Sequence, residues 1–296
     1  MKKNSSKTFK NNMIAYSFIA PNFIGYLIFT LIPVVFTLVL SLCEWNAGDK
    51  FWFVGLKNYQ RMIKNSTFRI SLFNTLYYAV CTVPVTMICS LGLARLLNTA
   101  IKGKTVFRSA IFFPHVAAVV AIAAVWNMMF NPDMGPVNML LQSIGIENPP
   151  RWAASTNWSM PVVILASIWR NVGYYMIIYL AGLQGIPGEL YEAAKMDGAS
   201  GWQSFRRITV PMLTPITFFV SIMLTISCFK VFDLIYTMTE GGPGRSTNVL
   251  VMHIYQSAFT EYKFGYASAV AMVLFVIVLV ITLIQFRAEK KWSDYM

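Results

Sequence analysis

The sequence predicts an all-α, polytopic membrane protein with six transmembrane helices, because its charges are too few for a water-soluble surface and six apolar stretches are long enough to cross a bilayer. Of the 296 residues, 56% are hydrophobic and only 12% are charged, which is about half the charged share of a soluble domain. So few charges cannot cover a surface that faces water. A crossing needs about 20 apolar residues, and the stretches that qualify are roughly 14–43, 71–99, 107–130, 159–185, 212–239 and 266–286.

The first stretch, 14–43, follows a basic head like that of a secretory signal peptide. Its apolar run is too long for a signal peptide, and no pair of small residues marks a cleavage site after it. We therefore expect this stretch to be an uncleaved helix.

The balance of charge predicts the orientation of the chain. There are 24 Lys and Arg against 12 Asp and Glu. In a soluble protein this excess would suggest nucleic acid, but in a membrane protein basic residues gather in cytosolic loops. With the N-terminus inside, more basic residues fall inside than outside, so we expect both termini in the cytosol and no nucleic-acid partner. The outside segment 44–70 departs from this trend, and its aromatic residues suggest that it lies along the membrane interface; they include Trp45, Phe51, Trp52, Phe53 and Tyr59.

The residue types that carry catalysis are too scattered to form an enzyme site. His115 and His253 are far apart in the sequence, so they lack the spacing of a paired-histidine metal site. Gly103-Lys104-Thr105 ends like a phosphate-binding loop, but Asn98 stands where that loop needs its first glycine, and a membrane helix precedes it in place of a strand. We expect that the chain is not an enzyme.

The segment 186–211, between the fourth and fifth spans, reads as two short helices. Pro187 suits the start of the first helix, where a missing N–H costs nothing. Gly198 suits its end, in the left-handed conformation, and Pro211 should stop the second helix. One face of the first helix holds Leu190, Ala193 and Ala194. Two of these side chains are small, so another protein can approach this face closely. A helix pair lying on lipid would show the same pattern.

The same segment is similar to the "EAA" loop of ABC-importer permeases. The matching residues are Glu192-Ala193-Ala194, Asp197-Gly198-Ala199, Phe205, Ile208, Pro211 and Pro215. Two other segments resemble sugar-importer permeases, and they contain Phe112-Phe113-Pro114, Trp126, Phe130, Gly135 and Asn138, then Phe232-Asp233, Thr239 and Gly241-Gly242-Pro243. The likeness covers nearly the whole chain and is closest to carbohydrate-uptake permeases related to the larger maltose-transporter permease and to glycerol-3-phosphate permeases.

This resemblance implies a single type I transmembrane domain over residues 1–296, in the cell membrane of a bacterium or archaeon. It also implies three kinds of partner: a second, homologous permease, two cytosolic ATPase subunits and an extracytoplasmic solute-binding protein. ATP and Mg²⁺ would be bound by the ATPase subunits, and this chain would hold no cofactor. Closure of the ATPases would rock the permease from inward-facing to outward-facing.

The resemblance also assigns the first short helix of 186–211 to a cleft of the ATPase. Glu192 would pair with an arginine there, but one exposed ion pair contributes only about 0–1 kcal/mol. Packing of apolar side chains should therefore supply most of the docking energy, while Glu192 sets the register. The residues that this assigns to coupling are Leu190, Glu192, Ala193, Ala194, Met196, Asp197 and Gly198.

Charged residues inside the fourth and fifth spans indicate a solute path, because each costs several kcal/mol unless it is paired or hydrated. By resemblance, the path residues are Trp169, Arg170, Asn171, Tyr174, Phe229, Lys230 and Asp233. Aromatic faces and fixed polar groups suit a sugar. Two alternatives remain: Lys230 and Asp233 can simply pair on one helix face, and Arg170 with Asn171 can satisfy backbone groups at a kink near Gly173.

The segment Glu240-Gly241-Gly242-Pro243, at the outer end of the fifth span, contains glycines that permit a tight turn. By resemblance it is an outer gate and a contact for the solute-binding protein. It can equally serve as a helix terminator.

These observations predict a permease subunit that forms half of the translocation path of an ABC importer for a mono- or oligosaccharide. The alternative substrate is glycerol phosphate or another charged polyol or acidic sugar, because Lys230 and Asp233 replace the uncharged amides of related sugar permeases. A secondary transporter would show inverted repeats, which the sequence lacks, and a membrane enzyme would need a nucleophile or metal site.

Overall fold

The computed structural model describes residues 3–48, 51–99 and 102–293, and it confirms an all-α membrane architecture. Four helices are long and apolar enough to cross a membrane: Asn12–Ser41, Ser66–Leu97, Ser159–Gln184 and Phe264–Glu289. The number rises to six if each of two bent helix pairs counts as one span. The chain divides into two compact units, residues 1–64 with 256–273 and residues 65–255 with 274–296, and each is described by itself.

The first unit begins with a long, largely exposed apolar helical run. It consists of α1 (Lys3–Tyr26), the π-helical turn η1 (Leu27–Leu31) and α2 (Ile32–Ser41). The π turn lies just before Pro33, which has no N–H for the usual i→i−4 bond. The wider turn absorbs that defect, so the helix continues unbroken.

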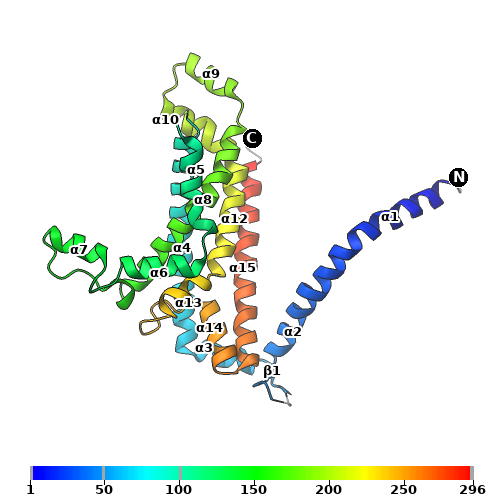
Figure 1. Cartoon of the computed structure of the whole chain (residues 1–296). Helices are drawn as coiled ribbons and strands as arrows, with labels where there is room; N and C mark the ends of the chain where they lie inside the picture. Colours follow the sequence, from blue (N-terminus) through cyan, green and yellow to red (C-terminus); the bar gives the residue numbers. More distant parts are fainter. Residues whose placement is uncertain (1–2, 49–50, 100–101, 294–296) are drawn as a thin grey trace. The chain divides into compact units, whose positions relative to one another are not determined.

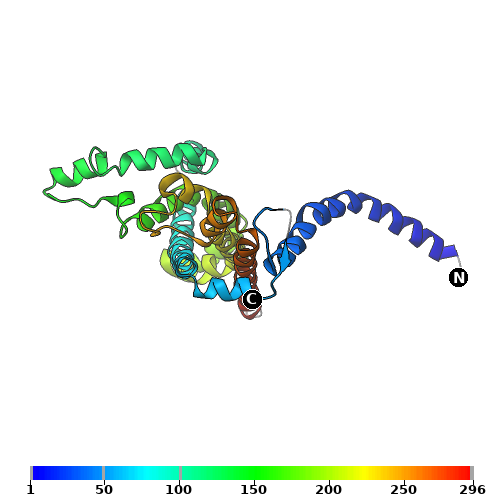
Figure 2. The same cartoon turned by 90° about the horizontal axis from the view of Figure 1, so that it is seen from below.

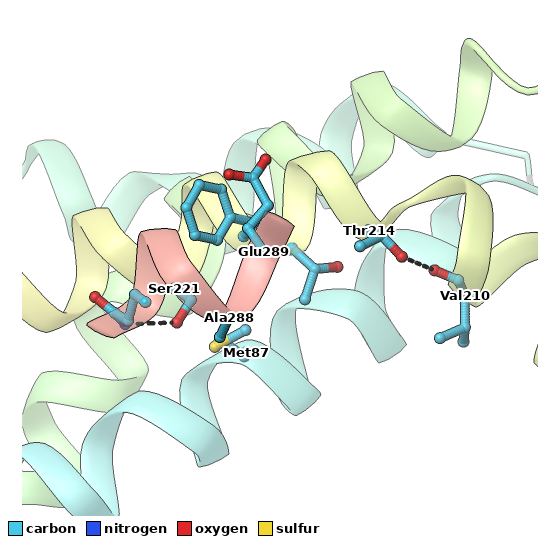
Figure 3. Close-up of a pocket in the computed structure, with 9 residues that line it drawn as sticks. Met87, Val210, Thr214, Ser221, Ala288 and Glu289 are labelled. Atoms are coloured by element: carbon cyan, nitrogen blue, oxygen red, sulfur yellow. Dashed lines mark hydrogen bonds between the residues drawn. The ribbon is translucent and has the colours of Figure 1, made fainter. Parts of the chain in front are cut away.

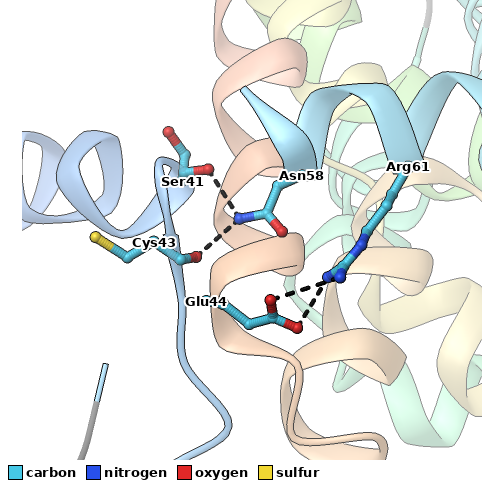
Figure 4. A network of polar contacts seen from close by, with 5 residues as sticks. All are labelled: Ser41, Cys43, Glu44, Asn58 and Arg61. Carbon is cyan, nitrogen blue, oxygen red and sulfur yellow. Dashed lines mark hydrogen bonds and ion pairs between the residues drawn. The ribbon is translucent and has the colours of Figure 1, made fainter. Parts of the chain in front are cut away.

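A polar cluster closes the first unit, and Figure 4 shows its residues. It joins the end of α2 to a short antiparallel hairpin, β1 (Cys43–Glu44) and β2 (Trp52–Phe53), and to α3 (Lys57–Lys64). Asn58 is 1% exposed and donates to the carbonyl oxygens of Ser41 (3.0 Å) and Cys43 (2.8 Å). Arg61 donates to Glu44 at 2.9 Å, and this hydrogen bond, with the nearby positive charge, holds the pKa of Glu44 below its ordinary value.

The hairpin exposes its aromatic residues: Phe51 is 64%, Trp52 61% and Phe53 75% exposed. This is compatible with a position along the membrane interface, which stays a prediction for the segment 44–70. The unit is completed by η4 (Gln256–Thr260) and the first part of α15 (Phe264–Ser293). Gly265 permits this closure, since a Cβ there would lie 2.0 Å from the carbonyl oxygen of Cys43.

The second unit is a helical bundle built on α4 (Ser66–Leu97) and α8 (Ser159–Gln184), which pack along each other (Figure 1). Buried polar side chains join these two helices: Tyr78 donates to Ser167 Oγ at 2.5 Å, and Ser90 donates to the carbonyl oxygen of Val172 at 2.9 Å. Such contacts satisfy groups that lipid could not. The other helices of this unit are α5 (Lys104–Val116), α6 (Val119–Met129), α7 (Pro136–Ser143), η2 (Trp152–Ala154), α9 (Gly188–Met196), α10 (Gly201–Ser204), η3 (Phe205–Thr209), α11 (Val210–Met212), α12 (Thr214–Phe229), α13 (Asp233–Thr239) and α14 (Leu250–Tyr255).

The predicted span 107–130 is divided in the structure. The axes of α5 and α6 differ by 98°, so α6 runs sideways from the end of α5, as Figures 1 and 2 both show. The break falls at Ala117 and Ala118, which adopt extended ψ angles of 148° and 130°. Alanine favours helix, so local propensity gives no signal for this break.

The predicted span 212–239 is also divided. The helical run from Gly201 to Met212 bends by 65° before α12 begins. Helix α12 then ends at Phe229, and α13 starts at Asp233 after a short non-helical segment. The sequence suggested that Pro211 stops a helix. In the structure it lies within the short helix α11 instead. The π turn η3 precedes it and absorbs its missing N–H.

Gly173 does not interrupt α8, which is continuous from Ser159 to Gln184. Its role is to admit α5: a Cβ at this position would lie 2.0 Å from the carbonyl oxygen of Ile111. A small residue lets the two backbones approach closely, as is common between membrane helices.

Candidate functional site

Helix α9 lies beyond the end of α8, at one end of the second unit (Figure 1). Pro187 precedes it as the N-cap, with φ −58° and ψ 129°. Gly198 follows it in the left-handed conformation, with φ +75°. Gly198 N donates to Lys195 O at 3.1 Å and Ala199 N to Ala194 O at 2.9 Å, which is the Schellman pattern of a helix C-terminus. The sequence-based prediction of this cap is confirmed.

Five of the seven residues predicted for coupling lie on α9, which has no buried residue, and Asp197 and Gly198 follow its end. Met196 is 88% and Leu190 is 40% exposed. Glu192, Ala193, Asp197 and Gly198 are also exposed, and Ala194 is half-buried. Exposed apolar side chains beside two alanines form a surface onto which another protein can pack closely.

The rest of the loop anchors α9 to the bundle. Ser200 and Gln203 form a reciprocal capping box at the start of α10. Tyr191 and the buried Thr209 share a hydrogen bond of 2.9 Å between their hydroxyl groups. This bond joins α9 to the turn that leads into α12.

A second group of predicted residues meets around a small cavity. The cavity has a volume of about 130 Å³ and lies where the break between α12 and α13 faces α8. Four of the seven predicted path residues line it, and these are Arg170, Asn171, Lys230 and Asp233. The helix break opens this site, because it turns Lys230 and Asp233 out of a regular helix.

Lys230 and Asp233 do not form an ion pair within 4.0 Å in the part of the chain that the structure describes. They also do not share a helix face, since Lys230 caps α12 and Asp233 begins α13. Simple mutual pairing, as one alternative suggested, does not account for them. Both side chains are exposed in this chain alone.

Arg170 and Asn171 differ in how their polar atoms are satisfied. Asn171 donates to the carbonyl oxygen of Ser167 at 2.9 Å and to its hydroxyl at 3.3 Å. Arg170 Nε is buried and has no hydrogen-bond partner among the described residues. A buried donor without a partner is costly, so this side chain is suited to receive an acceptor from a ligand.

The other three predicted path residues lie outside the cavity. Trp169 is 43% exposed and packs near Trp126, with ring centroids 5.9 Å apart. Tyr174 stacks on His115 at 4.5 Å. Phe229 is 3% exposed, inside the bundle. In this conformation the aromatic lining comes from Tyr78 and Phe232, which were not among the predicted path residues.

The segment Glu240-Gly241-Gly242-Pro243 forms a tight turn after α13. Glu240 and Gly241 both have left-handed φ angles, +51° and +84°. Buried Thr247 donates to the carbonyl oxygen of Gly242 at 2.8 Å and shares a hydrogen bond with Thr239. Glu240 is exposed. The turn therefore terminates α13, as one of the two sequence-based alternatives expected.

The loop after this turn is tied to α4 by residues that the sequence did not single out. Asn74 donates to the carbonyl oxygens of Arg245 and Asn248, both at 3.0 Å, and Ser71 donates to Asn248 Oδ1 at 2.9 Å. The polar residues spaced along the second apolar stretch were the sequence signal that could have predicted this contact. These hydrogen bonds hold the loop that follows the turn against α4.

A second cavity of about 310 Å³ lies between α12 and the end of α15, and Figure 3 shows its lining residues. Gln285 crosses it to donate to Ser221 at 3.0 Å and to Thr225 at 3.1 Å. These bonds hold the end of α15 against α12. The predicted site residues, all of which the structure describes, lie elsewhere and do not line this cavity.

Comparison with known proteins identifies the family. Residues 71–294 match the family model described as "Binding-protein-dependent transport system inner membrane component". The chain belongs to this family. The lactose transport system permease protein LacF of Rhizobium radiobacter is 38% identical over 279 residues, covering 93% of each chain. The sn-glycerol-3-phosphate transport system permease protein UgpA of Agrobacterium fabrum is 34% identical over 292 residues, covering 98% of this chain and 99% of the relative.

Among solved structures, a chain of the bacterial alginate ABC transporter, determined with an alginate pentasaccharide-bound periplasmic protein, superimposes with a TM-score of 0.83. It is 24% identical and covers 94% of both chains. The fold is therefore that of an ABC-importer permease, and the predicted family is confirmed.

Proposed function

We propose that this permease forms half of the translocation path of an ABC importer for a sugar, a mono- or oligosaccharide. The observation that carries the proposal is the cavity at the α12–α13 break, which brings together Arg170, Asn171, Lys230 and Asp233. Donors and acceptors placed beside aromatic rings suit the hydroxyl groups and apolar faces of a sugar. The similarity to a lactose permease supports the same substrate class.

The volume of about 130 Å³ is smaller than a disaccharide needs, so this chain supplies one wall of the path and the homologous permease supplies the other. Trp169, which is exposed, would then face the partner permease across the path. Tyr174 and Phe229 would enter the path only if α8 and α12 move during the transport cycle.

The energy source lies in two ATPase subunits, which bind ATP and Mg²⁺ and receive α9 in a cleft. The exposed apolar surface around Leu190, Ala193 and Met196 supports this arrangement. The end of the molecule that carries α9 is then cytosolic, as are both termini. The turn Glu240–Pro243 faces the extracytoplasmic solute-binding protein.

A charged substrate is the second candidate, because Lys230 and Asp233 are not paired with each other and Arg170 has an unsatisfied Nε. Glycerol phosphate, another charged polyol or an acidic sugar would find a positive partner here. The similarity to a glycerol-3-phosphate permease favours this alternative.

The substrate class can be tested with the co-encoded solute-binding protein and the reconstituted importer. We expect a neutral sugar to raise the melting temperature of the binding protein and to be taken up by proteoliposomes that contain all subunits and ATP. Uptake of glycerol 3-phosphate, with no sugar taken up, would replace the first candidate by the second. ATP-independent uptake would contradict both.

A further inference from the structure

A third cavity lies at the α9 end of the second unit and is separate from the proposed solute path. It has a volume of about 570 Å³. Its walls are the last turn of α4, the end of α8 and the segment 191–209. The residues that line it are Arg95, Asn98, Thr99, Leu183, Tyr191, Lys195, Ala199, Gly201, Ser204, Phe205 and Thr209.

The charges in this cavity are of one sign. Arg95 and Lys195 line it, and none of the Asp and Glu residues that the structure describes does. Neither cation takes part in the ion pairs of the described part of the chain, which join Arg61 to Glu44 and Lys263 to Glu261. A concave surface with two cations and no carboxylate concentrates positive potential. It therefore attracts an anion.

Arg95 is held in a defined position. Its guanidinium carbon lies over the Phe205 ring, 4.3 Å from the centroid, a cation–π contact that restrains the side chain. This contact does not use the N–H groups of the guanidinium, and two parallel N–H groups match the oxygens of a phosphate. The donor is thus oriented before a ligand arrives.

Neutral polar residues line the same cavity as the two cations. The side chains of Asn98, Thr99 and Ser204 line the same walls. The hydrogen bond between Tyr191 and Thr209 fixes the wall formed by α9 against the turn before α12. The small residues Ala199 and Gly201 leave the volume open beside these groups. The cavity therefore has room for more than a bare ion.

We propose that this cavity binds a phosphate-bearing anion, which bridges Arg95 at the end of α4 to Lys195 in α9. The phosphate belongs either to a soluble phosphate ester or to the headgroup of an anionic lipid, since both offer the same oxygens. Because Lys195 lies in the helix proposed to contact the ATPase, the bound anion restrains that helix against the bundle. This inference concerns regulation beyond the proposed transport function, and binding can be measured without transport.

The test uses the purified full chain in phosphatidylcholine nanodiscs with two probes. Glucose 6-phosphate represents soluble esters, and phosphatidic acid incorporated into the nanodisc represents lipid. Binding is measured by native mass spectrometry, together with hydrogen exchange of the amides of residues 191–199. We expect saturable binding of one probe and slower exchange in this segment. Arg95→Gln or Lys195→Gln should each raise the Kd about tenfold, because each removes a charge-assisted hydrogen bond.

Two matched variants, Arg206→Gln and Lys102→Gln, remove a positive charge without altering the cavity lining, and they should leave the Kd unchanged. Binding of glucose 6-phosphate alone identifies a soluble ester as the ligand, and binding of phosphatidic acid alone identifies a lipid. Equal weakening by all four variants would overturn the proposal, because it would reveal diffuse attraction to basic surface. Absence of saturable binding of either probe to the wild-type chain would also overturn it, whether or not the variants fold.

Discussion

At the scale of single residues, the break between α12 and α13 bears most on Lys230 and Asp233, which the sequence alone placed on one continuous helix. Both line the small cavity, both are exposed, and they form no ion pair with each other within the described chain. An ionised carboxylate in such a place can accept hydrogen bonds from two hydroxyl groups of a solute.

The first prediction is that Asp233→Asn reduces uptake by the assembled importer about tenfold or more, because a hydrogen bond to a charged group contributes about 1.5–3 kcal/mol. The double variant Lys230→Met with Asp233→Leu should fold and assemble yet lose uptake. Uptake is measured in proteoliposomes and normalised to the complex recovered in detergent. Glu147→Gln, an exposed carboxylate outside the cavity, serves as the control. Wild-type uptake by the double variant would refute a solute contact.

Asn58 illustrates how one buried amide holds several segments together. It donates to two backbone carbonyl oxygens that α2 and β1 leave available. The second prediction is that Asn58→Ala lowers the free energy of unfolding of this unit by about 2 kcal/mol, since an unpaired buried acceptor costs about 1–3 kcal/mol. The melting temperature in detergent measures this. Gln60→Ala, at an exposed position of the same helix, should leave it unchanged. An equal effect of both variants would contradict the role of Asn58.

At the scale of elements, the hairpin and α3 also carry a pH-dependent contact. The pKa of Glu44 is lowered by Arg61, so the pair stabilises the fold above the ordinary pKa of glutamate. That stabilisation is lost as pH falls through the lowered pKa. The third prediction is a small effect, at most about 1 kcal/mol, because both side chains are partly exposed and solvent screens them. Glu44→Gln should flatten the acid limb of the melting-temperature curve. If Glu44→Gln leaves the dependence of melting temperature on pH unchanged, Glu44 is not the source of this stabilisation.

Helix α9 is an element whose exposed surface indicates a partner. The fourth prediction compares two substitutions on it. Ala193→Trp should abolish coupled uptake, because a large ring cannot fit where the proposed contact needs a small side chain. Glu192→Ala should weaken ATPase docking by no more than about 1 kcal/mol, with Glu189→Ala as the charge control. Co-purification with the ATPase and uptake are measured together. Normal coupling in the Ala193→Trp complex would show that α9 does not insert into a cleft.

The sequence predicted those elements that depend on composition or on a few neighbouring residues. Apolar length revealed the spans, and Gly198 revealed the end of α9, because only the left-handed conformation closes that helix. The breaks at Ala117–Ala118 and after Phe229 had no such signal. The break at Ala117–Ala118 falls on residues that favour helix, so local propensity gives no signal for it. For the same reason, Phe229 was expected in the path although it is buried.

At the scale of the whole molecule, we propose that the permease is one of several subunits that transport requires. Its cavity of about 130 Å³ would provide one wall of the proposed path, and the surface of α9 that we propose for coupling is exposed. The tie between Tyr191 and Thr209 connects this surface to the turn that leads into α12. Under the proposed function, a movement of α9 would be passed to this turn, and the partner subunits would supply the driving force and the second wall of the path.

The fifth prediction follows from this incompleteness. The chain reconstituted alone should neither hydrolyse ATP nor accumulate solute, and addition of the ATPase subunits without the second permease should not restore uptake. Only the full set, with the solute-binding protein, should give ATP-dependent accumulation, because force and path are divided among the chains. Radiolabelled solute uptake and phosphate release are measured for each combination. Accumulation by this chain alone would refute its assignment as one subunit of an importer, whereas activity with two copies of this chain and the ATPases would show that the second permease is a copy of the first.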